Sequence, residues 1–202
     1  MLDAHLRPLI DPSLNRAGRG LAGWGVSADG VTLAGLVLGL LSAATIAAGY
    51  PFWALVPLLG SRLLDGLDGA VARATRRTDF GGYLDIVCDF AFYGAVPLAF
   101  AVLDPGANAP AAAFLLFAFY VNGTSFLGLA ILAEKRGLRT DRQGAKSLYY
   151  SAGLLEGTET IAFLAAICLL PSLFAPLAWT FGALCLVTAV ARVLQARQMA
   201  GR

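Results

Sequence analysis

Long apolar runs alternate with short polar segments along most of the chain. A helix needs about 20 apolar residues to cross the hydrocarbon core of a bilayer, and six segments of this kind can be placed. Their approximate ranges are 29–49, 52–73, 80–103, 110–133, 147–170 and 173–194. Turn-forming residues interrupt the pattern at 49–51, 104–106 and 171–172. The pattern predicts an all-α integral membrane protein with six transmembrane helices.

The distribution of Lys and Arg supports this count, although the second, third and fifth spans contain charged residues. Fourteen of the 15 basic residues lie before the first span, between the second and third, between the fourth and fifth, or near the end of the chain. The exception, Arg62, lies inside the second span. Under the positive-inside rule, six spans with both termini in the cytoplasm put these fourteen on one side. We therefore expect a multi-pass protein of the inner, cytoplasmic membrane.

Residues 1–26 precede the first span and have a different pattern. Leu2, Leu6, Leu9, Ile10 and Leu14 fall roughly along one helical face, which predicts a helix lying in the membrane interface and broken by the prolines at 8 and 12. A partly ordered tail is the alternative. The segment lacks the features of a signal peptide, and residues 1–202 read as a single membrane domain.

The composition agrees with a membrane location. Hydrophobic residues make up 58% of the chain and charged residues 14%, whereas soluble domains carry about 25% charged residues. The net charge of +2 and the absence of a basic tract give no indication of nucleic acid binding. Lipids and small molecules are the expected partners.

Four carboxylates form the most informative cluster in the sequence. Asp65 and Asp68 are three residues apart near the cytoplasmic end of the second span, and Asp85 and Asp89 are four apart in the third. Each pair projects from one helical face, and the short link between the spans brings the two faces to similar depth. A charge at a helix centre costs about 3 kcal/mol, and too few cations are near for a salt-bridge network. Divalent metals resolve the repulsion, and four carboxylates can hold two ions about 4 Å apart.

Small residues and one arginine surround the first acidic pair. Gly66, Gly69, Ala70 and Ala72 leave the helix surface shallow, and Arg73 offers a forked guanidinium for phosphate oxygens. Close helix packing is the alternative explanation for the small residues. Together with the carboxylates, they favour a phosphate-containing ligand.

The segments Asp65-Gly-Leu-Asp68-Gly69-Ala-Val-Ala72-Arg73 and Gly81-Gly-Tyr-Leu-Asp85-Ile-Val-Cys-Asp89 resemble the signature of the CDP-alcohol phosphotransferase family. That signature is D-x-x-D-G-x-x-A-R followed by G-x-x-x-D-x-x-x-D, and all eight fixed positions are present. Seven residues separate Arg73 from Gly81, one fewer than in many members. The resemblance implies six helices around a polar cavity open to the cytoplasm, in a homodimer.

The resemblance also implies a reaction and a set of site residues. A two-metal enzyme, using Mg²⁺ or alternatively Mn²⁺, transfers a substituted phosphate from a CDP-linked donor to an alcohol and releases CMP. Asp65, Asp68 and Asp85 resemble metal ligands, and Asp89 resembles the general base, which also touches a metal. The CDP-contacting positions would be Gly69, Ala72 and Arg73.

Four other polar residues are candidates for substrate contacts. Asp29 and Thr32 begin the first span. They either belong to the helix start, with Asp29 or Ser27 capping the first turn, or contact cytidine. Glu156 and Glu159 lie in the fifth span and form either an acceptor pocket or an interhelical hydrogen-bond network.

Three functions fit these observations to different degrees. The first is a phospholipid synthase with CDP-diacylglycerol as the donor and a small alcohol as the acceptor. The second uses a soluble donor of the CDP-choline or CDP-ethanolamine type, with diacylglycerol as the acceptor. The third is a divalent-cation transporter, which the lack of acidic residues in the outer half of the spans disfavours.

Overall fold

The computed structural model describes residues 3–137 and 157–200, and every regular element in these ranges is helical. The helices are α1 (Asp3–Gly23), α2 (Ala28–Ala47), α3 (Pro51–Ala74), α4 (Asp79–Leu103), α5 (Pro105–Lys135), α6 (Gly157–Leu169) and α7 (Phe174–Ala200). A short 3-10 helix, η1 (Pro171–Leu173), precedes α7. The expected all-α class is confirmed for the described residues.

Local sequence signals explain where several helices begin. Ser27 caps α2 by accepting a hydrogen bond of 3.1 Å from the Gly30 amide, and Thr78 caps α4 through the Gly81 amide at 2.9 Å. Asp104 caps α5 in the same way. Gly49 has a φ of 94° and makes the tight turn from α2 to α3, a conformation that favours glycine.

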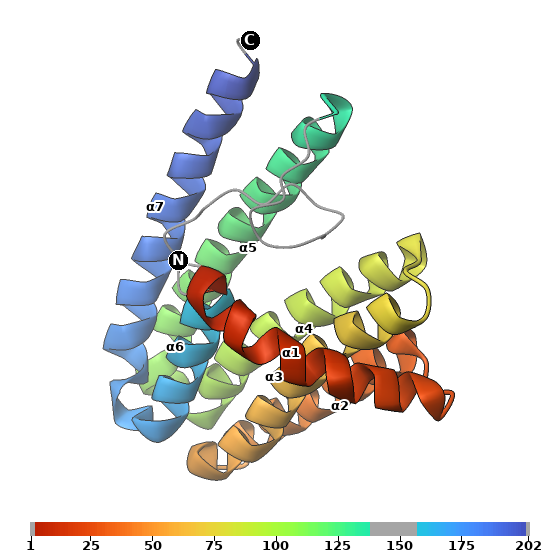
Figure 1. Ribbon diagram of the computed structural model, residues 1–202. Helices are drawn as coiled ribbons and strands as arrows, with labels where there is room; N and C mark the ends of the chain where they lie inside the picture. Colours follow the sequence, from red (N-terminus) through yellow and green to blue (C-terminus); the bar gives the residue numbers. More distant parts are fainter. Residues whose placement is uncertain (1–2, 138–156, 201–202) are drawn as a thin grey trace.

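The helices form two neighbouring groups (Figure 1). In the first group, α2, α3 and α4 pack together, and α1 lies across α3. In the second, α5 and α7 run side by side. Buried aromatic side chains fill the core, and the Phe100 and Phe174 rings stack with centroids 4.4 Å apart. The ends of α3 and α4 that carry the acidic residues belong to the first group.

Four of the described helices are long and apolar enough to cross a membrane: α2, α4, α5 and the continuous segment Pro171–Met199, which includes α7. The helix α3 is 24 residues long but carries Arg62, Asp65, Asp68 and Arg73, which lower its mean hydropathy. Only 13 residues of α6 are described, and the first part of the expected span 147–170 lies outside the described residues. Six spans, the cavity opening and the side of the membrane therefore stay predictions.

Large apolar side chains are exposed along the outer faces of these helices. Val37 of α2, Val56 of α3 and Val190 of α7 are 64%, 70% and 59% exposed. Such a continuous apolar exterior is unfavourable in water, whereas lipid tails accept it readily. The outer surface supports the membrane assignment independently of hydropathy.

The helix α1 corrects one expectation. It runs for 21 residues through both Pro8 and Pro12, so the prolines do not break it. Each proline removes one intrahelical hydrogen bond, yet the helix is continuous and α1 packs against α3. At the closest approach, a side chain at Gly18 would lie 2.7 Å from the carbonyl carbon of Ala70. The segment is a regular helix rather than a partly ordered tail.

Candidate active site

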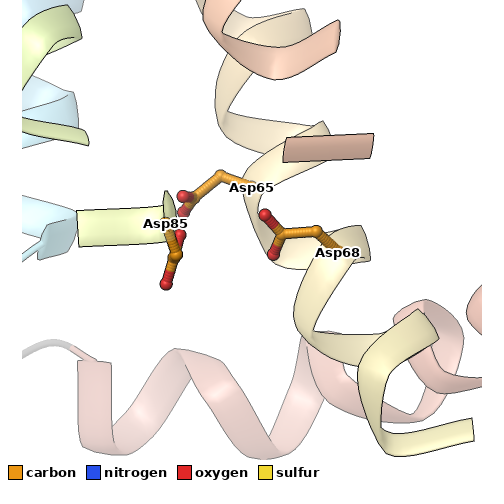
Figure 2. Close-up of side chains that lie close together, drawn as sticks. All are labelled: Asp65, Asp68 and Asp85. Atoms are coloured by element: carbon orange, nitrogen blue, oxygen red, sulfur yellow. The ribbon is translucent and has the colours of Figure 1, made fainter. Parts of the chain in front are cut away.

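Three of the predicted carboxylates converge where α3 meets α4. Asp65 and Asp68 come from successive turns of α3, and Asp85 comes from the second turn of α4. One carboxylate oxygen of each lies within 4.8 Å of the others. Figure 2 shows Asp65 and Asp85 close to one another, with Asp68 pointing toward them from the next turn of α3. The spacing in the sequence predicted a group of four carboxylates, and three of them meet in the structure.

The chemistry of this group fits a divalent cation. All three donors are hard carboxylate oxygens, which Mg²⁺ and Mn²⁺ prefer. Asp68 is buried, and Asp65 and Asp85 are partly accessible, so the group is enclosed on one side and open on the other. Such a site leaves coordination positions for a substrate.

Asp68 is held from a neighbouring helix. The Thr32 hydroxyl of α2 donates a hydrogen bond of 2.6 Å to Asp68 Oδ2, and both residues are buried. Hydroxyls in such positions orient carboxylates in the way that the outer partners of metal ligands do. Thr32 thus contacts an acidic residue, and its contact with cytidine stays a prediction.

Asp89 pairs with a buried arginine of α3. Its Oδ1 atom accepts a hydrogen bond of 2.7 Å from Arg62 Nη1, and the same nitrogen lies 3.8 Å from Asp65 Oδ1. Asp89 therefore lies beside the three-carboxylate group, tied to a guanidinium from α3. The sequence pattern placed Arg62 one turn before Asp65 but gave it no role in the site.

The two glycines of α3 beside the acidic residues, Gly66 and Gly69, face different side chains. The side chain of Leu14 of α1 covers Gly66, and a side chain at Gly66 would lie 3.0 Å from it. At Gly69, a side chain would instead lie 3.3 Å from Arg73 NH1. Close helix packing is therefore confirmed at Gly66, whereas the surface at Gly69 lies under the Arg73 guanidinium. Ala72 is partly exposed beside it.

Arg73 is exposed to solvent, but a hydrogen bond holds its side chain. Its Nε donates a hydrogen bond of 3.0 Å to Asn15 Oδ1 of α1. No motif in the sequence pointed to Asn15, because the contact joins residues 58 positions apart and depends on how α1 crosses α3.

A polar cleft lies beside the beginning of α2. It has a volume of about 320 Å³ and is lined by Ala22, Gly25, Val26, Ser27, Ala28, Asp29, Thr75, Arg76 and Thr78. Ser27, rather than Asp29, caps α2, so the Asp29 carboxylate is available to this cleft. That carboxylate would also lie 3.1 Å from a side chain at Gly81, which places the cleft next to the start of the second motif.

One of the two candidate acceptor residues lies in the part of the chain that the structure describes. Glu156 lies outside the described residues. Glu159 is partly buried in the first turn of α6.

The buried residue Arg192 of α7 contacts α5. It donates hydrogen bonds to the Asn122 carbonyl at 3.2 Å and to Asn122 Oδ1 at 2.8 Å. Asn122 of α5 is thus tied to α7 through Arg192, and the acceptor pocket stays a prediction.

Comparisons with known proteins agree with the motif. A protein-family model described as CDP-alcohol phosphatidyltransferase matches residues 26–195. The inner membrane protein YnjF of Escherichia coli K12 is 49% identical over 193 residues, which cover 96% of this chain and 94% of that protein. The archaetidylinositol phosphate synthase of Pyrococcus horikoshii is 35% identical over 87 residues, covering 43% of this chain and 46% of that protein.

Solved structures of the phosphatidylinositol phosphate synthase of Mycobacterium tuberculosis have the same fold. The structure with CDP-DAG bound has a TM-score of 0.72 at 23% identity and covers 91% of this chain and 92% of that one. The structure in complex with manganese and citrate has a TM-score of 0.71 at 25% identity, with coverage of 91% and 88%.

The family match covers most of the chain, and the full signature lies within it, with three of its carboxylates gathered in one group. The chain is a membrane transferase of substituted phosphate groups, and it belongs to the CDP-alcohol phosphatidyltransferase family.

Proposed function

We propose that this protein transfers the phosphatidyl group of CDP-diacylglycerol to an alcohol and releases CMP, as a single domain of the inner membrane. The observation that carries the proposal is the convergence of Asp65, Asp68 and Asp85 on the same helix pair as Arg73. A site of hard oxygen donors beside a guanidinium suits a diphosphate with its metal ions. The CDP-DAG bound to the structural relative supports this choice of donor.

In this proposal, Asp65, Asp68 and Asp85 hold two divalent ions, Mg²⁺ or Mn²⁺, with Asp89 at the edge of the metal site. The ions would neutralise the diphosphate and stabilise negative charge on the attacking and leaving oxygens. The complex of a structural relative with manganese supports a divalent ion. The metal site would face the cytoplasm, as would both termini.

The nucleotide would lie along α3 and the start of α2. Arg73 would bind the diphosphate over the bare surface of Gly69, with Ala72 alongside. The cleft lined by Asp29 is open to polar groups and would suit the cytidine ring, and Thr32 would contact the nucleotide from one turn further along α2. We expect a homodimer in the membrane, with the acceptor entering near Glu156 and Glu159.

Asp89 would act as the general base. The acceptor hydroxyl gives its proton to Asp89 while its oxygen forms a bond to the phosphorus of the phosphatidyl group. The bond from that phosphorus to the bridging diphosphate oxygen breaks, and CMP leaves with the electron pair. Holding the hydroxyl in line supplies much of the rate, because orientation replaces a bimolecular encounter.

The test is CMP release by the purified protein in lipid nanodiscs. The assay contains Mg²⁺, labelled CDP-diacylglycerol and a panel of acceptors: free polyols, polyol phosphates, amino alcohols and phosphatidylglycerol-type lipids. A parallel set offers diacylglycerol with CDP-choline or CDP-ethanolamine. CMP release in the first set that is absent from the Asp89→Asn variant supports the proposal. CMP release in the second set alone would show that the donor is a soluble CDP-alcohol and not CDP-diacylglycerol. No CMP release in either set would refute the proposal.

A further inference from the structure

An apolar groove runs along one side of the α5 and α7 pair. The two helices run in the same direction and lie side by side (Figure 1). The groove has a volume of about 610 Å³, and its walls include Phe117 and Val121 of α5 and Leu186 and Val190 of α7. Its lining spans residues 117–125 and 186–194, which is a rise of about 12 Å along each helix. The groove is therefore elongated along the helix axes.

The hydroxyl groups that line the groove are turned back onto their own helix. Thr124 donates to the Tyr120 and Val121 carbonyls at 2.9 and 3.0 Å. Ser125 donates to the Asn122 carbonyl at 2.7 Å. Because a hydroxyl has a single proton, both protons are used within α5. A polar ligand would lose its hydrogen bonds to water here, whereas an alkyl chain loses none.

Basic residues continue both walls of the groove toward the C-terminal ends of the helices. Lys135 lies two heptads after Val121 on α5, and Arg197 lies one heptad after Val190 on α7. A helix turns by only about 20° per heptad relative to a straight stripe, so each basic residue projects from the same side as its groove wall. Both are exposed. Between Val121 and Lys135, an added side chain at Gly128 would meet nothing within 4 Å, so the path between them is open.

The C-terminal ends of α5 and α7 are held together. The guanidinium of Arg136 donates a hydrogen bond to the Met199 carbonyl. Lys135 precedes one partner of this contact and Arg197 lies close to the other, so both flank the same end of the groove. Glu134 also lies at this end of α5, but it projects about 100° around the helix from Lys135. The groove therefore leads to a positively charged end.

We propose that the groove binds a membrane phospholipid with an anionic headgroup. One acyl chain lies between α5 and α7, and the headgroup phosphate lies at Lys135 and Arg197, in the leaflet that meets the C-terminal ends of these helices. An apolar groove that leads to two cations is complementary to this ligand in polarity and in charge. The site uses none of the acidic residues of α3 and α4, so it does not depend on the proposed function.

A helix from a second copy of this chain is the alternative occupant. Transmembrane helices associate through small residues that let their backbones approach, or through hydrogen bonds between helices. The groove walls instead carry large side chains, and Phe117, Val190 and Leu194 are 55%, 59% and 54% exposed. The hydroxyls of Thr124 and Ser125 are already engaged within α5. These features favour a lipid over a helix.

Native mass spectrometry of the purified protein in detergent, with added lipid, measures this binding. Dioleoyl phosphatidylglycerol and dioleoyl phosphatidylcholine carry the same chains and differ in headgroup charge. The wild type should bind one phosphatidylglycerol roughly tenfold more tightly than phosphatidylcholine, because two cations attract the anionic headgroup. The double variant Lys135→Ala/Arg197→Ala should lose this preference.

The matched control for charge is Arg16→Ala/Arg19→Ala, which removes two exposed cations from α1. This control should keep the preference for phosphatidylglycerol. A preference that survives in Lys135→Ala/Arg197→Ala, or that falls equally in both double variants, would overturn the proposal. These variants change only exposed side chains, so they test the proposal even if a variant inside the groove does not fold.

Thr124→Phe tests the place of the acyl chain, because its ring would fill the groove. Both lipids should bind roughly tenfold more weakly, since the chain loses its buried apolar contact. Thr180→Phe is the matched control: Thr180 is exposed on α7 outside the groove, and its hydroxyl also bonds within its own helix, to the Pro176 carbonyl. Unchanged lipid binding in Thr124→Phe would refute the proposal. If that variant also changed from dimer to monomer, the groove would belong to a second copy.

Discussion

Asn15 of α1 accepts a hydrogen bond of 3.0 Å from the Nε atom of Arg73 on α3. This contact joins the N-terminal helix to the residue that we propose for the diphosphate. It occupies the Nε edge of the guanidinium and leaves Nη1 near Gly69. The N-terminal helix therefore contributes to the orientation of the guanidinium that we propose for the diphosphate.

Replacing Asn15 by Ala should weaken donor binding more than it slows transfer. Without its acceptor, Arg73 gains rotamer freedom, and ordering such a side chain again on binding costs about 1 kcal/mol. The KM for CDP-diacylglycerol should rise roughly fivefold, with a change of less than twofold in kcat. Ser13→Ala on the exposed face of α1 is the control and should behave like the wild type. An equal fall in kcat would contradict this reading of Asn15.

Substitution of Gly18 should separate α1 from α3. A side chain there would lie 2.7 Å from both the carbonyl carbon and the Cβ of Ala70, so Gly18→Val should destabilise the protein by about 2 kcal/mol. The thermal midpoint in detergent measures this effect. The control is Gly20→Ala, where a side chain meets nothing within 4 Å and the helix should be slightly stabilised. A midpoint equal to that of the wild type in Gly18→Val would show that α1 does not rest on α3.

Thr32→Val should loosen metal binding without unfolding the protein. Valine matches the shape of threonine but cannot donate to Asp68, which the Thr32 hydroxyl contacts at 2.6 Å. Removing an outer partner of a metal ligand reduces affinity by about tenfold or more, and Mn²⁺ titration of the purified protein measures it. Thr45→Val is the matched control on the same helix, because among the described residues the Thr45 hydroxyl bonds only to the Leu41 carbonyl. Equal Mn²⁺ affinities in the two variants would argue against Asp68 as a ligand.

Chelation of divalent ions should lower the stability of the protein as well as stop CMP release. Three carboxylates within 4.8 Å repel one another without a cation. At 100 times its dissociation constant, a bound ion stabilises the folded state by about 2.7 kcal/mol. The thermal midpoint should therefore rise when Mg²⁺ is added to chelated protein, and Asp85→Asn should lose most of that rise. A rise of the same size in Asp85→Asn would place the ion elsewhere.

Most of the acidic site could be predicted from the sequence, because its residues are brought together by the helical repeat and one short link. Residues three apart in a helix lie on the same face, so Asp65 and Asp68 project together. The short link between α3 and α4 reverses the chain and brings Asp85 beside them. The same reasoning placed Asp89 with the group. It could not predict the hydrogen bond between Arg62 and Asp89, because the two residues are 27 positions apart. Which of several nearby carboxylates pairs with a cation depends on side-chain packing against Phe92 and not on spacing.

Other parts of the structure depend on tertiary contacts that no local pattern encodes. Pro8 and Pro12 indicated a broken helix, yet α1 is continuous through both and packs against α3. Gly66 and Gly69 looked equivalent in the sequence, but one faces Leu14 and the other faces Arg73. Their difference arises from the angle at which α1 crosses α3.

The position of α1 also bears on how relatives of this protein are delimited. The family match begins at residue 26, after both Gly18 and Asn15. A truncated protein that starts at that boundary would keep every signature residue and still lose the acceptor that fixes Arg73. Sequence comparisons restricted to the matched region would likewise miss any variation at Asn15 that tunes donor affinity from one relative to another.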